Sequence, residues 1–472
     1  MVLFNSIVSD INNFLWTYVI IVVLIACGIG FTLRTRFVQL TMLPEMLRLL
    51  VTDGRSKRVH GTVSSFQAFC VSTASRVGVG NIAGVAIAIV TGGPGAIFWM
   101  WLIAFIGSAT GFIESTLAQI YKLPRGKNRF HGGPAYYIQN RLHQPAVAKL
   151  FAVLISITFG LIYVSVQANT IALSLETAFT VPPLLTAAVI AILTAVSISG
   201  GMVRIARITA YFVPIMAGLY LLTAFAVILM NLDKVPGMFA LIIHDAFTPQ
   251  AAVGGGIGTT ILTGIRRGLF SNEAGEGSVP NAAATANVSH PVKQGLVQAF
   301  GVYVDTWIVC TATAFIVLLS GQYTIGGELT GIALTQKSLE SIFGGLAPGA
   351  VALMILLFAF SSVIGNYYYG EINIAFFETK SRLPLTLYRV FVVVMAAFGC
   401  VAELPLVWNL ADLFMGFLAL TNLYAIARLA KYACAALDDY STKKKSGITE
   451  PDFSSDTLGD SDGIHAWSSE TK

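Results

Sequence analysis

The chain has 472 residues, of which 55% are hydrophobic and 11% charged, and its mean hydropathy is +0.74. This composition excludes a water-soluble globular protein and indicates an integral membrane protein. The formal net charge of +5 does not indicate a nucleic-acid partner, because the basic residues are spread over many loops and form no single patch.

Eleven apolar segments are each long enough to cross a lipid bilayer as a helix, which takes about 20 residues. Their approximate bounds are 16–34, 64–90, 94–121, 149–179, 183–200, 207–231, 251–286, 292–321, 347–378, 385–402 and 406–431. Open sheets leave backbone groups unsatisfied in lipid, and these segments lack the alternation of barrel strands, so helices are expected. The predicted fold class is an all-α polytopic membrane protein with about eleven transmembrane helices.

The distribution of basic residues predicts the orientation of the chain. If the loop after the first span is cytoplasmic, most basic residues of the loops fall on that side. They include Arg34, Arg36, Arg48, Arg55, Lys122, Arg125, Arg129, Arg141, Lys149, Arg204, Arg207, Lys293, Arg382, Arg389, Arg428 and the run from Lys443 to Lys445. The other side keeps only Lys234 and Lys337, so the positive-inside rule places the N-terminus outside and the C-terminus in the cytoplasm.

Five regions follow from these spans. They are an N-terminal transmembrane helix with a cytoplasmic amphipathic linker (1–63), a first five-helix repeat (64–231), an extracytoplasmic connector (232–250), a second five-helix repeat (251–431) and a polar cytoplasmic tail (432–472). An odd number of spans in each repeat inverts the second repeat relative to the first. The tail is rich in Ser, Asp, Thr and Lys, which predicts disorder.

Each repeat begins with an irregular span. The two stretches are SRVGVGNIAG, residues 75–84, and GIRRGLFSNEAGEGS, residues 264–278, both rich in glycine and polar at membrane depth. Irregular backbone is tolerated in a membrane only where it lines a protein cavity. Interrupted helices in matching positions of two halves therefore indicate the binding site of an inverted-repeat transporter.

The glycines of the first stretch, Gly78, Gly80 and Gly84, also fit a small-residue face that packs membrane helices together. Packing needs neither Arg76 nor Asn81, and an arginine at the bilayer centre costs about 2.5 to 3.5 kcal/mol on insertion scales. A binding site is therefore the favoured interpretation. A channel stays open as an alternative, since it too lines its pore with broken helices. No phosphate-cradling loop, HExxH, CxxC or GxSxG motif indicates a pump or an enzyme.

Four stretches in chain order carry a resemblance to a known family. They are VGVGNIAGVA from Val77, GGPGAIFWMWLIAFIG from Gly92, GLFSNEAGEGSVPNAAA from Gly268 and FAFSSVIGNYYYGE from Phe358. They resemble the motifs of the alanine or glycine:cation symporter family, and the resemblance extends over residues 62 to 432.

The resemblance implies a leucine-transporter-type fold, in which one extra helix precedes a 5+5 inverted-repeat core with broken first and sixth core helices. It implies sodium-coupled symport of a small neutral amino acid, alanine or glycine, into the cell by alternating access. Sodium would be the coupling ion, with no other cofactor and no enzymatic activity, and the protein would lie in the cell (inner) membrane as a multi-pass protein. Other amino acids, such as glutamine or serine, and coupling to protons remain open, as do the enantiomer, the ion stoichiometry and the oligomeric state.

The family motifs also imply which residues bind the substrate. The unwound backbone of Gly78, Val79 and Gly80 would hold the carboxylate, since free N–H groups and a half-helix dipole favour an anion. The side chains implied are Asn81, Arg76, Gln167, Phe270, Ser271, Asn272 and Asn366. The alternatives are an interhelical hydrogen bond for Gln167 and a plain core position for Phe270.

The sodium site implied by the resemblance consists of backbone carbonyls and two adjacent hydroxyls. The carbonyls are those of Ala74, Val77 and Phe358, and the hydroxyls are those of Ser361 and Ser362. Five neutral oxygens suit a monovalent hard cation, whereas a divalent cation would attract carboxylates. The alternative for the two serines is a hydrogen bond to the preceding turn of their own helix.

This chain departs from the family at Arg76 and Val79, where many members carry threonine. One hypothesis is that Arg76 replaces a second sodium ion and pairs with the substrate carboxylate or with Glu273; the alternative is a structural salt bridge. The acidic residues near membrane depth are Glu273, Glu276, Asp305 and Glu371. They are expected to pair with Arg76, Arg266 or Arg267 rather than to relay protons.

Overall fold

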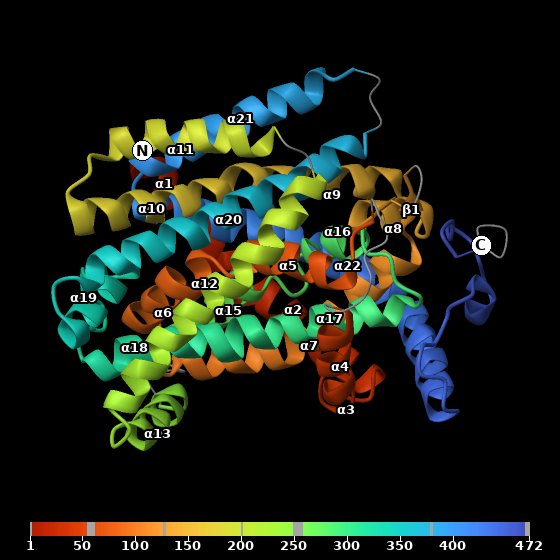
Figure 1. The fold of residues 1–472 in the computed structure, drawn as a ribbon, viewed down its shortest axis with the longest axis horizontal. Coiled ribbons are helices and arrows are strands. Elements are labelled where there is room, and N and C mark those ends of the chain that lie inside the picture. Colours follow the sequence, from red (N-terminus) through yellow and green to blue (C-terminus); the bar gives the residue numbers. More distant parts are fainter. Residues whose placement is uncertain are drawn as a thin grey trace.

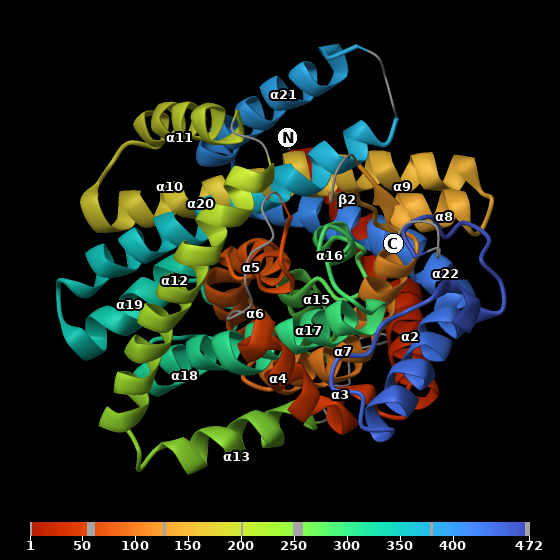
Figure 2. The same cartoon turned by 45° about the vertical axis from the view of Figure 1, so that its right-hand side comes forward.

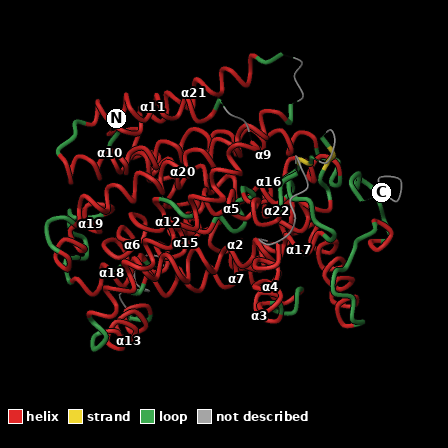
Figure 3. Tube along the Cα trace, viewed as in Figure 1, coloured by secondary structure: helices red, strands yellow, loops and turns green. Residues whose placement is uncertain are grey.

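The computed structural model describes residues 2–53, 62–125, 129–199, 202–248, 258–377 and 381–467. Regular structure in these residues is helical (Figure 3), apart from a two-stranded antiparallel hairpin of β1 (Leu123–Pro124) and β2 (Phe130–His131) and an isolated bridge.

The helices of the first half are α1 (Val2–Leu15), η1 (Trp16–Ile20), α2 (Ile21–Arg34), α3 (Val38–Thr41), α4 (Leu43–Asp53), α5 (Ser65–Arg76), η2 (Gly80–Gly84), α6 (Val85–Gly92), α7 (Ala96–Ile120), α8 (Pro134–Asn140), α9 (Pro145–Ile157), η3 (Thr158–Tyr163), α10 (Val164–Phe179), α11 (Pro183–Ile198), α12 (Met202–Met230) and α13 (Val235–Ala246). Those of the second half are α15 (Thr259–Asn272), α16 (Val279–Ala283), α17 (Pro291–Val302), η4 (Tyr303–Cys310), α18 (Thr311–Ser320), α19 (Gly331–Phe343), α20 (Ala347–Ala375), α21 (Leu383–Val401), α22 (Leu404–Lys445) and η5 (Ser455–Leu458).

Among the described residues, eight helices are long and apolar enough to cross a membrane, or nine if the pair Ser65–Arg76 and Gly80–Gly92, bent by 50°, counts as one span. These nine agree in position with nine of the eleven predicted spans. The span predicted at 183–200 is α11, which has 16 residues. The span predicted at 251–286 is divided into α15 and α16, and its first residues, 251–257, lie outside the described part. The all-α polytopic class is confirmed, with fewer full-length spans than predicted.

The broken helices lie in the centre of the bundle. Figure 2 shows α5, α6, α15 and α16 near the middle, with α10 and α20 on one side and α7 and α17 on the other. The helices α11 and α21 pack against each other at an outer edge (Figure 1). Because other helices cover the central elements, the polar groups at the breaks are shielded from lipid, as irregular backbone in a membrane requires.

The first broken helix starts at a capping box. Ser64 Oγ accepts the N–H of Gln67 at 3.1 Å, and Gln67 Oε1 accepts the N–H of Ser64 at 3.1 Å, so two N–H groups at the helix start are satisfied. Just before it, Val63 pairs with Ala286 in a parallel bridge, and its carbonyl accepts the N–H of Asn287 at 3.0 Å. The start of the first broken helix is thereby joined to the chain that follows α16.

The tail differs from its predicted disorder. The helix α22 continues to Lys445, beyond the predicted end at residue 431, and residues 446–467 return to the same end of the bundle. Their contacts include Ser289 Oγ to Pro451 O at 2.8 Å, Arg141 to Asp462 at 2.8 Å, Trp467 Nε1 to Gln119 O at 2.8 Å and an ion pair between Lys293 and Glu450. Composition predicts disorder because apolar residues are few, but Phe453, which is 1% exposed, and Trp467 are enough to anchor the segment.

Replacing Phe453 by alanine should release this segment. The Phe453 ring packs against His290 and Trp467, with ring centroids 5.1 Å and 5.3 Å away. Truncating a buried phenylalanine costs about 3 kcal/mol or more in a protein core, so amide hydrogen exchange of residues 446–467 should become at least about tenfold faster. The matched control is Ile448→Ala in the same segment, where the side chain is 44% exposed and exchange should not change. Equal exchange in Phe453→Ala and the wild type would show that another contact holds the tail.

Candidate substrate and cation site

The first break lies between Arg76, where α5 ends, and Gly80, where η2 begins. A Cβ on Gly78 would lie 2.4 Å from Ser362 Oγ and 3.0 Å from Gln167 Oε1, so only glycine fits between α20 and α10 here. A Cβ on Gly80 would lie 3.0 Å from the Phe270 ring. The glycines do permit close packing, as the alternative interpretation held, but the residues that they approach are themselves predicted site residues.

The second break follows Asn272, where α15 ends. Glu273 has a left-handed backbone (φ 55°), and Gly275 and Gly277 also have positive φ. The Asn272 side chain accepts the N–H of Ala274 at 3.0 Å through Oδ1, and its Nδ2 lies 3.3 Å from Thr306 Oγ1. Asn272 therefore terminates its own helix, and its described contacts do not include the first break.

Two side-chain amides hold the N–H groups of the first break. The N–H of Gly78 donates to Asn81 Oδ1 at 2.9 Å, and the N–H of Val79 donates to Gln167 Oε1 at 3.1 Å. Asn81 and Gln167 are both buried. Amide oxygens thus accept hydrogen bonds at the position where the sequence predicts a carboxylate, and a carboxylate would accept these bonds more strongly because it is charged.

Asn81 also joins the two broken helices through Asp305 of η4. Asn81 Nδ2 donates to Asp305 Oδ1 at 2.6 Å and to Ser271 Oγ at 2.9 Å, and Ser271 Oγ donates to Asp305 Oδ2 at 2.7 Å. Asp305 is 1% exposed. Sequence reasoning expected this carboxylate to pair with an arginine and did not include it in the site. Its position in an otherwise apolar span is the signal that marks it.

Four of the five predicted sodium ligands lie together. Ser362 Oγ lies 2.8 Å from the Ala74 carbonyl oxygen and 3.1 Å from that of Phe358, and Ser361 Oγ donates to the Phe358 carbonyl at 2.8 Å. The bond of Ser361 stays within its helix, as the alternative interpretation predicted, whereas Ser362 bridges α20 and α5. The fifth residue, Val77, is the C-cap of α5 and the first residue of the break. A cluster of neutral oxygens is therefore present where a monovalent cation was predicted.

Asn366 and Glu273 meet on Ser75. Ser75 Oγ lies 2.7 Å from both Asn366 Oδ1 and Glu273 Oε1, to one of which its single proton is donated. Glu273 Oε2 accepts the hydroxyl of Ser278 at 2.6 Å. Asn366 Nδ2 is buried and has no hydrogen-bond partner among the described residues, so this amide is available to a substrate.

Arg76 contacts a different part of the bundle. Its Nη1 donates to the carbonyl of Gln298 on α17 at 3.2 Å, while Nε and Nη2 are buried without hydrogen-bond partners among the described residues. Within the same residues, no carboxylate lies close enough to Arg76 to form an ion pair. The predicted pair with Glu273 is therefore not seen. Ser72, one turn before Arg76, donates to Gln298 Oε1 at 2.7 Å, so both side chains lie on the α5 face toward α17.

The other predicted ion pairs have different partners as well. Arg266 and Arg267 both pair with Asp412 of α22, the former at 3.3 Å. Glu371 pairs with Arg389 at 3.2 Å, and Glu276 accepts the hydroxyl of Tyr163 at 3.2 Å. The sequence showed which charged residues need partners in the membrane. It did not show which helices bring those partners close.

An aromatic layer covers the break. The Phe270 ring, which contacts Gly80, lies 4.7 Å from the rings of both Tyr163 and Trp408. Tyr163 and Trp408 were not predicted to belong to the site. Tyr163 lies four residues before Gln167 in a continuous helix, so the two share one helix face, and this spacing could have identified it. The layer places a ring directly beside the unwound backbone, where it would limit the size of a ligand.

A cavity of about 490 Å³ lies beyond this layer, on the side predicted to face outward. Its lining residues are Ile87, Val90, Thr91, Thr263, Arg266, Arg267, Gly326, Gly327, Thr330, Leu404, Pro405, Trp408, Asn409 and Asp412. The Arg267 guanidinium stacks over the Trp408 ring at 4.6 Å and pairs with Asp412. Trp408 thus borders both the cavity and Phe270, and the aromatic layer with the Arg267–Asp412 pair separates the cavity from the break.

Comparison with known proteins identifies the family of this chain. The model of the sodium:alanine symporter family matches residues 1–455. Probable sodium/glutamine symporter GlnT of Bacillus subtilis is 51% identical over 98% of this chain and 96% of its own. Amino-acid carrier protein AlsT of B. subtilis is 47% identical over 99% and 98% of the two chains. Sodium/alanine symporter AgcS of Methanococcus maripaludis is 39% identical over 90% and 95%.

Among solved structures, a Na⁺-coupled sialic acid symporter is similar in fold, with a TM-score of 0.50 and 14% identity over 88% of this chain and 86% of its own. Identity this low supports the shared fold and nothing finer. The family match covers nearly the whole chain and includes both breaks and the oxygen cluster on α20. The chain is thus a multi-pass membrane transporter, not an enzyme, and it belongs to the sodium:alanine symporter family.

Proposed function

We propose that this transporter couples sodium to the uptake of a small neutral amino acid, alanine or glycine, by alternating access around the two breaks. The observation that carries the proposal is the contact of Ser362 Oγ with the Ala74 carbonyl at 2.8 Å, beside Gly78. This contact places an oxygen cluster suited to a cation beside unwound backbone whose N–H groups could bind an anion. We also propose that it lies in the cell membrane, with the N-terminus outside and the C-terminus in the cytoplasm, and needs no cofactor besides sodium.

The chemistry of an amino acid fits the groups around the break. Its carboxylate would take over the N–H groups of Gly78 and Val79 from the amides of Asn81 and Gln167, which lie 2.9 Å and 3.1 Å away. Its ammonium group needs acceptors, and Asn366 Oδ1 lies in the same region. A small side chain would fit under the Phe270 ring.

Glutamine is the second candidate substrate. The relative that is 51% identical carries the name probable sodium/glutamine symporter. The buried Asn366 Nδ2, which has no partner among the described residues, could donate a hydrogen bond to the amide oxygen of a longer side chain. A competition panel separates the two: alanine, glycine and serine should displace labelled alanine, whereas tryptophan and arginine should not. Stronger displacement by glutamine than by glycine would favour the glutamine carrier.

Removing the Ser362 hydroxyl should weaken the sodium dependence of uptake. A hydroxyl that bridges two helices and contributes to a cation site is worth about 1 to 3 kcal/mol, so the sodium concentration for half-maximal uptake by Ser362→Ala should rise about tenfold. Uptake of labelled alanine into proteoliposomes at graded sodium, with choline as replacement, measures this. The control is Ser341→Ala, whose hydroxyl also bonds back within its helix, to Ser338 O at 2.7 Å, but lies outside the site. A wild-type sodium response in Ser362→Ala would show that sodium binds at another site.

A further inference from the structure

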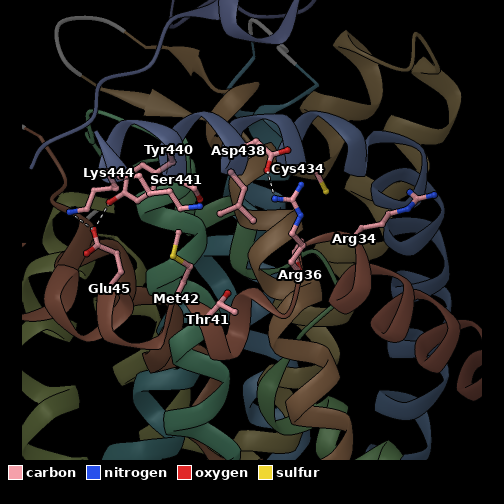
Figure 4. Close-up of a pocket in the computed structure, with 13 residues that line it drawn as sticks. Arg34, Arg36, Thr41, Met42, Glu45, Cys434, Asp438, Tyr440, Ser441 and Lys444 are labelled. Atoms are coloured by element: carbon pink, nitrogen blue, oxygen red, sulfur yellow. Dashed lines mark hydrogen bonds and ion pairs between the residues drawn. The ribbon is translucent and has the colours of Figure 1, made fainter. Parts of the chain in front are cut away.

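A second pocket, of about 360 Å³, lies at the far end of α2, where it meets α3, α4 and the last turns of α22. Figure 4 shows α22 passing over this pocket, with Asp438 directed toward Arg36 and Lys444 toward Glu45, while Arg34 points outward at one end. Its lining residues are Arg34, Thr35, Arg36, Thr41, Met42, Glu45, Cys434, Leu437, Asp438, Tyr440, Ser441, Lys444 and Lys445. None of them belongs to the substrate or cation site.

The pocket carries an excess of positive charge. Four lining residues are cationic and two are acidic, so four positive and two negative charges leave a formal charge of +2. Asp438 is engaged by Arg36 at 3.4 Å. Arg34 and Lys445 form no ion pair with any described residue. These two cations are therefore free to bind an anion from outside the chain.

The second carboxylate, that of Glu45, is fully occupied by the protein. It accepts two hydrogen bonds from Arg48, at 2.7 Å and 2.8 Å, and one from the Tyr440 hydroxyl at 2.6 Å, and Lys444 lies 3.3 Å away. Burial raises the pKa of Glu45, but the hydrogen bonds from Arg48 and Tyr440 outweigh burial and lower it to about 2. Glu45 is thus ionised at neutral pH and holds α4 to α22, which fixes the walls of the pocket.

Exposed apolar side chains adjoin the charged pocket. The span that contains α2 ends at Arg34, and Leu33, Phe37 and Leu40 around that end are exposed. Arg36 and Phe37 both have left-handed backbones, with φ of 54° and 57°, which is unfavourable for residues other than glycine. This turn directs Arg36 to the pocket while Phe37 stays exposed. Cations beside an apolar wall, at the point where a span ends, match the two parts of a phospholipid.

We propose that this pocket binds the headgroup of an anionic phospholipid, such as phosphatidylglycerol. The headgroup would lie along the positive rim of the pocket, with Arg34 at one end and Lys445 at the other, as in basic pockets between transmembrane helices that bind anionic headgroups. The acyl chains would run along Leu33 and Phe37. The bound lipid joins the first span to the end of α22 and adds a contact between two ends of the chain.

Lipid-dependent thermal unfolding of the purified protein in detergent tests this proposal. Phosphatidylglycerol should raise the unfolding temperature of the wild type more than phosphatidylcholine does. The double variant Arg34→Gln/Lys445→Gln should bind phosphatidylglycerol about thirtyfold more weakly, since each surface cation contributes about fivefold, and should lose the difference between the two lipids. The control is Lys149→Gln/Arg382→Gln, which removes two exposed basic residues outside the pocket and should behave like the wild type.

Three outcomes would overturn the proposal. The first is an equal loss of phosphatidylglycerol affinity in both double variants, which would mean that diffuse surface charge attracts the lipid. The second is a full shift produced by inorganic phosphate alone, which would mean that the pocket takes a soluble anion. The third is an unchanged lipid preference in Arg34→Gln/Lys445→Gln. Native mass spectrometry of phosphatidylglycerol adducts provides a readout that does not depend on stability.

Discussion

Gly78→Ala should abolish sodium-dependent amino-acid uptake while the protein still folds. The added Cβ would lie 2.4 Å from Ser362 Oγ, closer than real Cβ contacts allow, and 3.0 Å from Gln167 Oε1, which is a tight contact. Relief requires the Ser362 hydroxyl and the Gln167 amide to move away, which separates Ser362 from the Ala74 carbonyl and Gln167 from the N–H of Val79. Both halves of the site are affected by one methyl group, and misplacement by about 1 Å is enough to cost a hundredfold in activity.

The matched control for this variant is Gly30→Ala. Gly30 lies in the span that contains α2, and a Cβ there would have no heavy atom within 4 Å, so uptake should be unchanged. Uptake by proteoliposomes is measured for both variants, and size-exclusion profiles in detergent report folding. Near-wild-type uptake by Gly78→Ala would mean that the break can open without cost and that the packed geometry is not the one used in transport.

Asp412→Asn should lower the free energy of unfolding far more than the loss of an exposed ion pair does. The Asp412 side chain is buried and pairs with Arg267, which is also buried, and with Arg266 at 3.3 Å. Neutralising one partner of a buried ion pair leaves an uncompensated charge and costs about 3 to 5 kcal/mol, and here two guanidinium groups lose their counter-ion. The free energy of unfolding in mixed micelles should fall by about that amount, and the aromatic layer beside Trp408 should loosen.

An exposed ion pair provides the comparison. Lys337 and Glu340 lie 2.9 Å apart with side chains 53% and 37% exposed, and such pairs contribute less than about 1 kcal/mol. Glu340→Gln should therefore leave the free energy of unfolding within about 0.5 kcal/mol of the wild type. If Asp412→Asn were as stable as Glu340→Gln, the Arg267–Asp412 pair would have no structural role at this position.

The sequence predicted the breaks because they violate a strong local rule. A transmembrane helix has no reason to contain three glycines beside an asparagine and an arginine unless its backbone is used. Ser361, Ser362 and Asn366 were predicted differently, from the resemblance of FAFSSVIGNYYYGE to a family motif. Ser362 and Asn366 are four residues apart on α20 and so share one helix face, which agrees with their both facing α5.

Contacts between distant helices could not be predicted in the same way. Asp305 lies 224 residues from Asn81, and Asp412 lies 145 residues from Arg267. Nothing in a single sequence specifies which of several intramembrane acids meets which base, because that choice depends on helix rotation and depth. Arg76 illustrates this point, since its charge was noticed but its direction, toward Gln298, depends on the face of α5 that packs on α17.

Linked binding of alanine and sodium is the direct test of sodium-coupled symport at this site. Binding of labelled alanine to the purified protein is measured with sodium and with choline at constant pH, and sodium binding is measured with and without alanine. Sodium should increase the affinity for alanine, and alanine should increase the affinity for sodium by the same factor, because linkage is reciprocal. Alanine binding that does not change when choline replaces sodium would contradict sodium-coupled symport at this site.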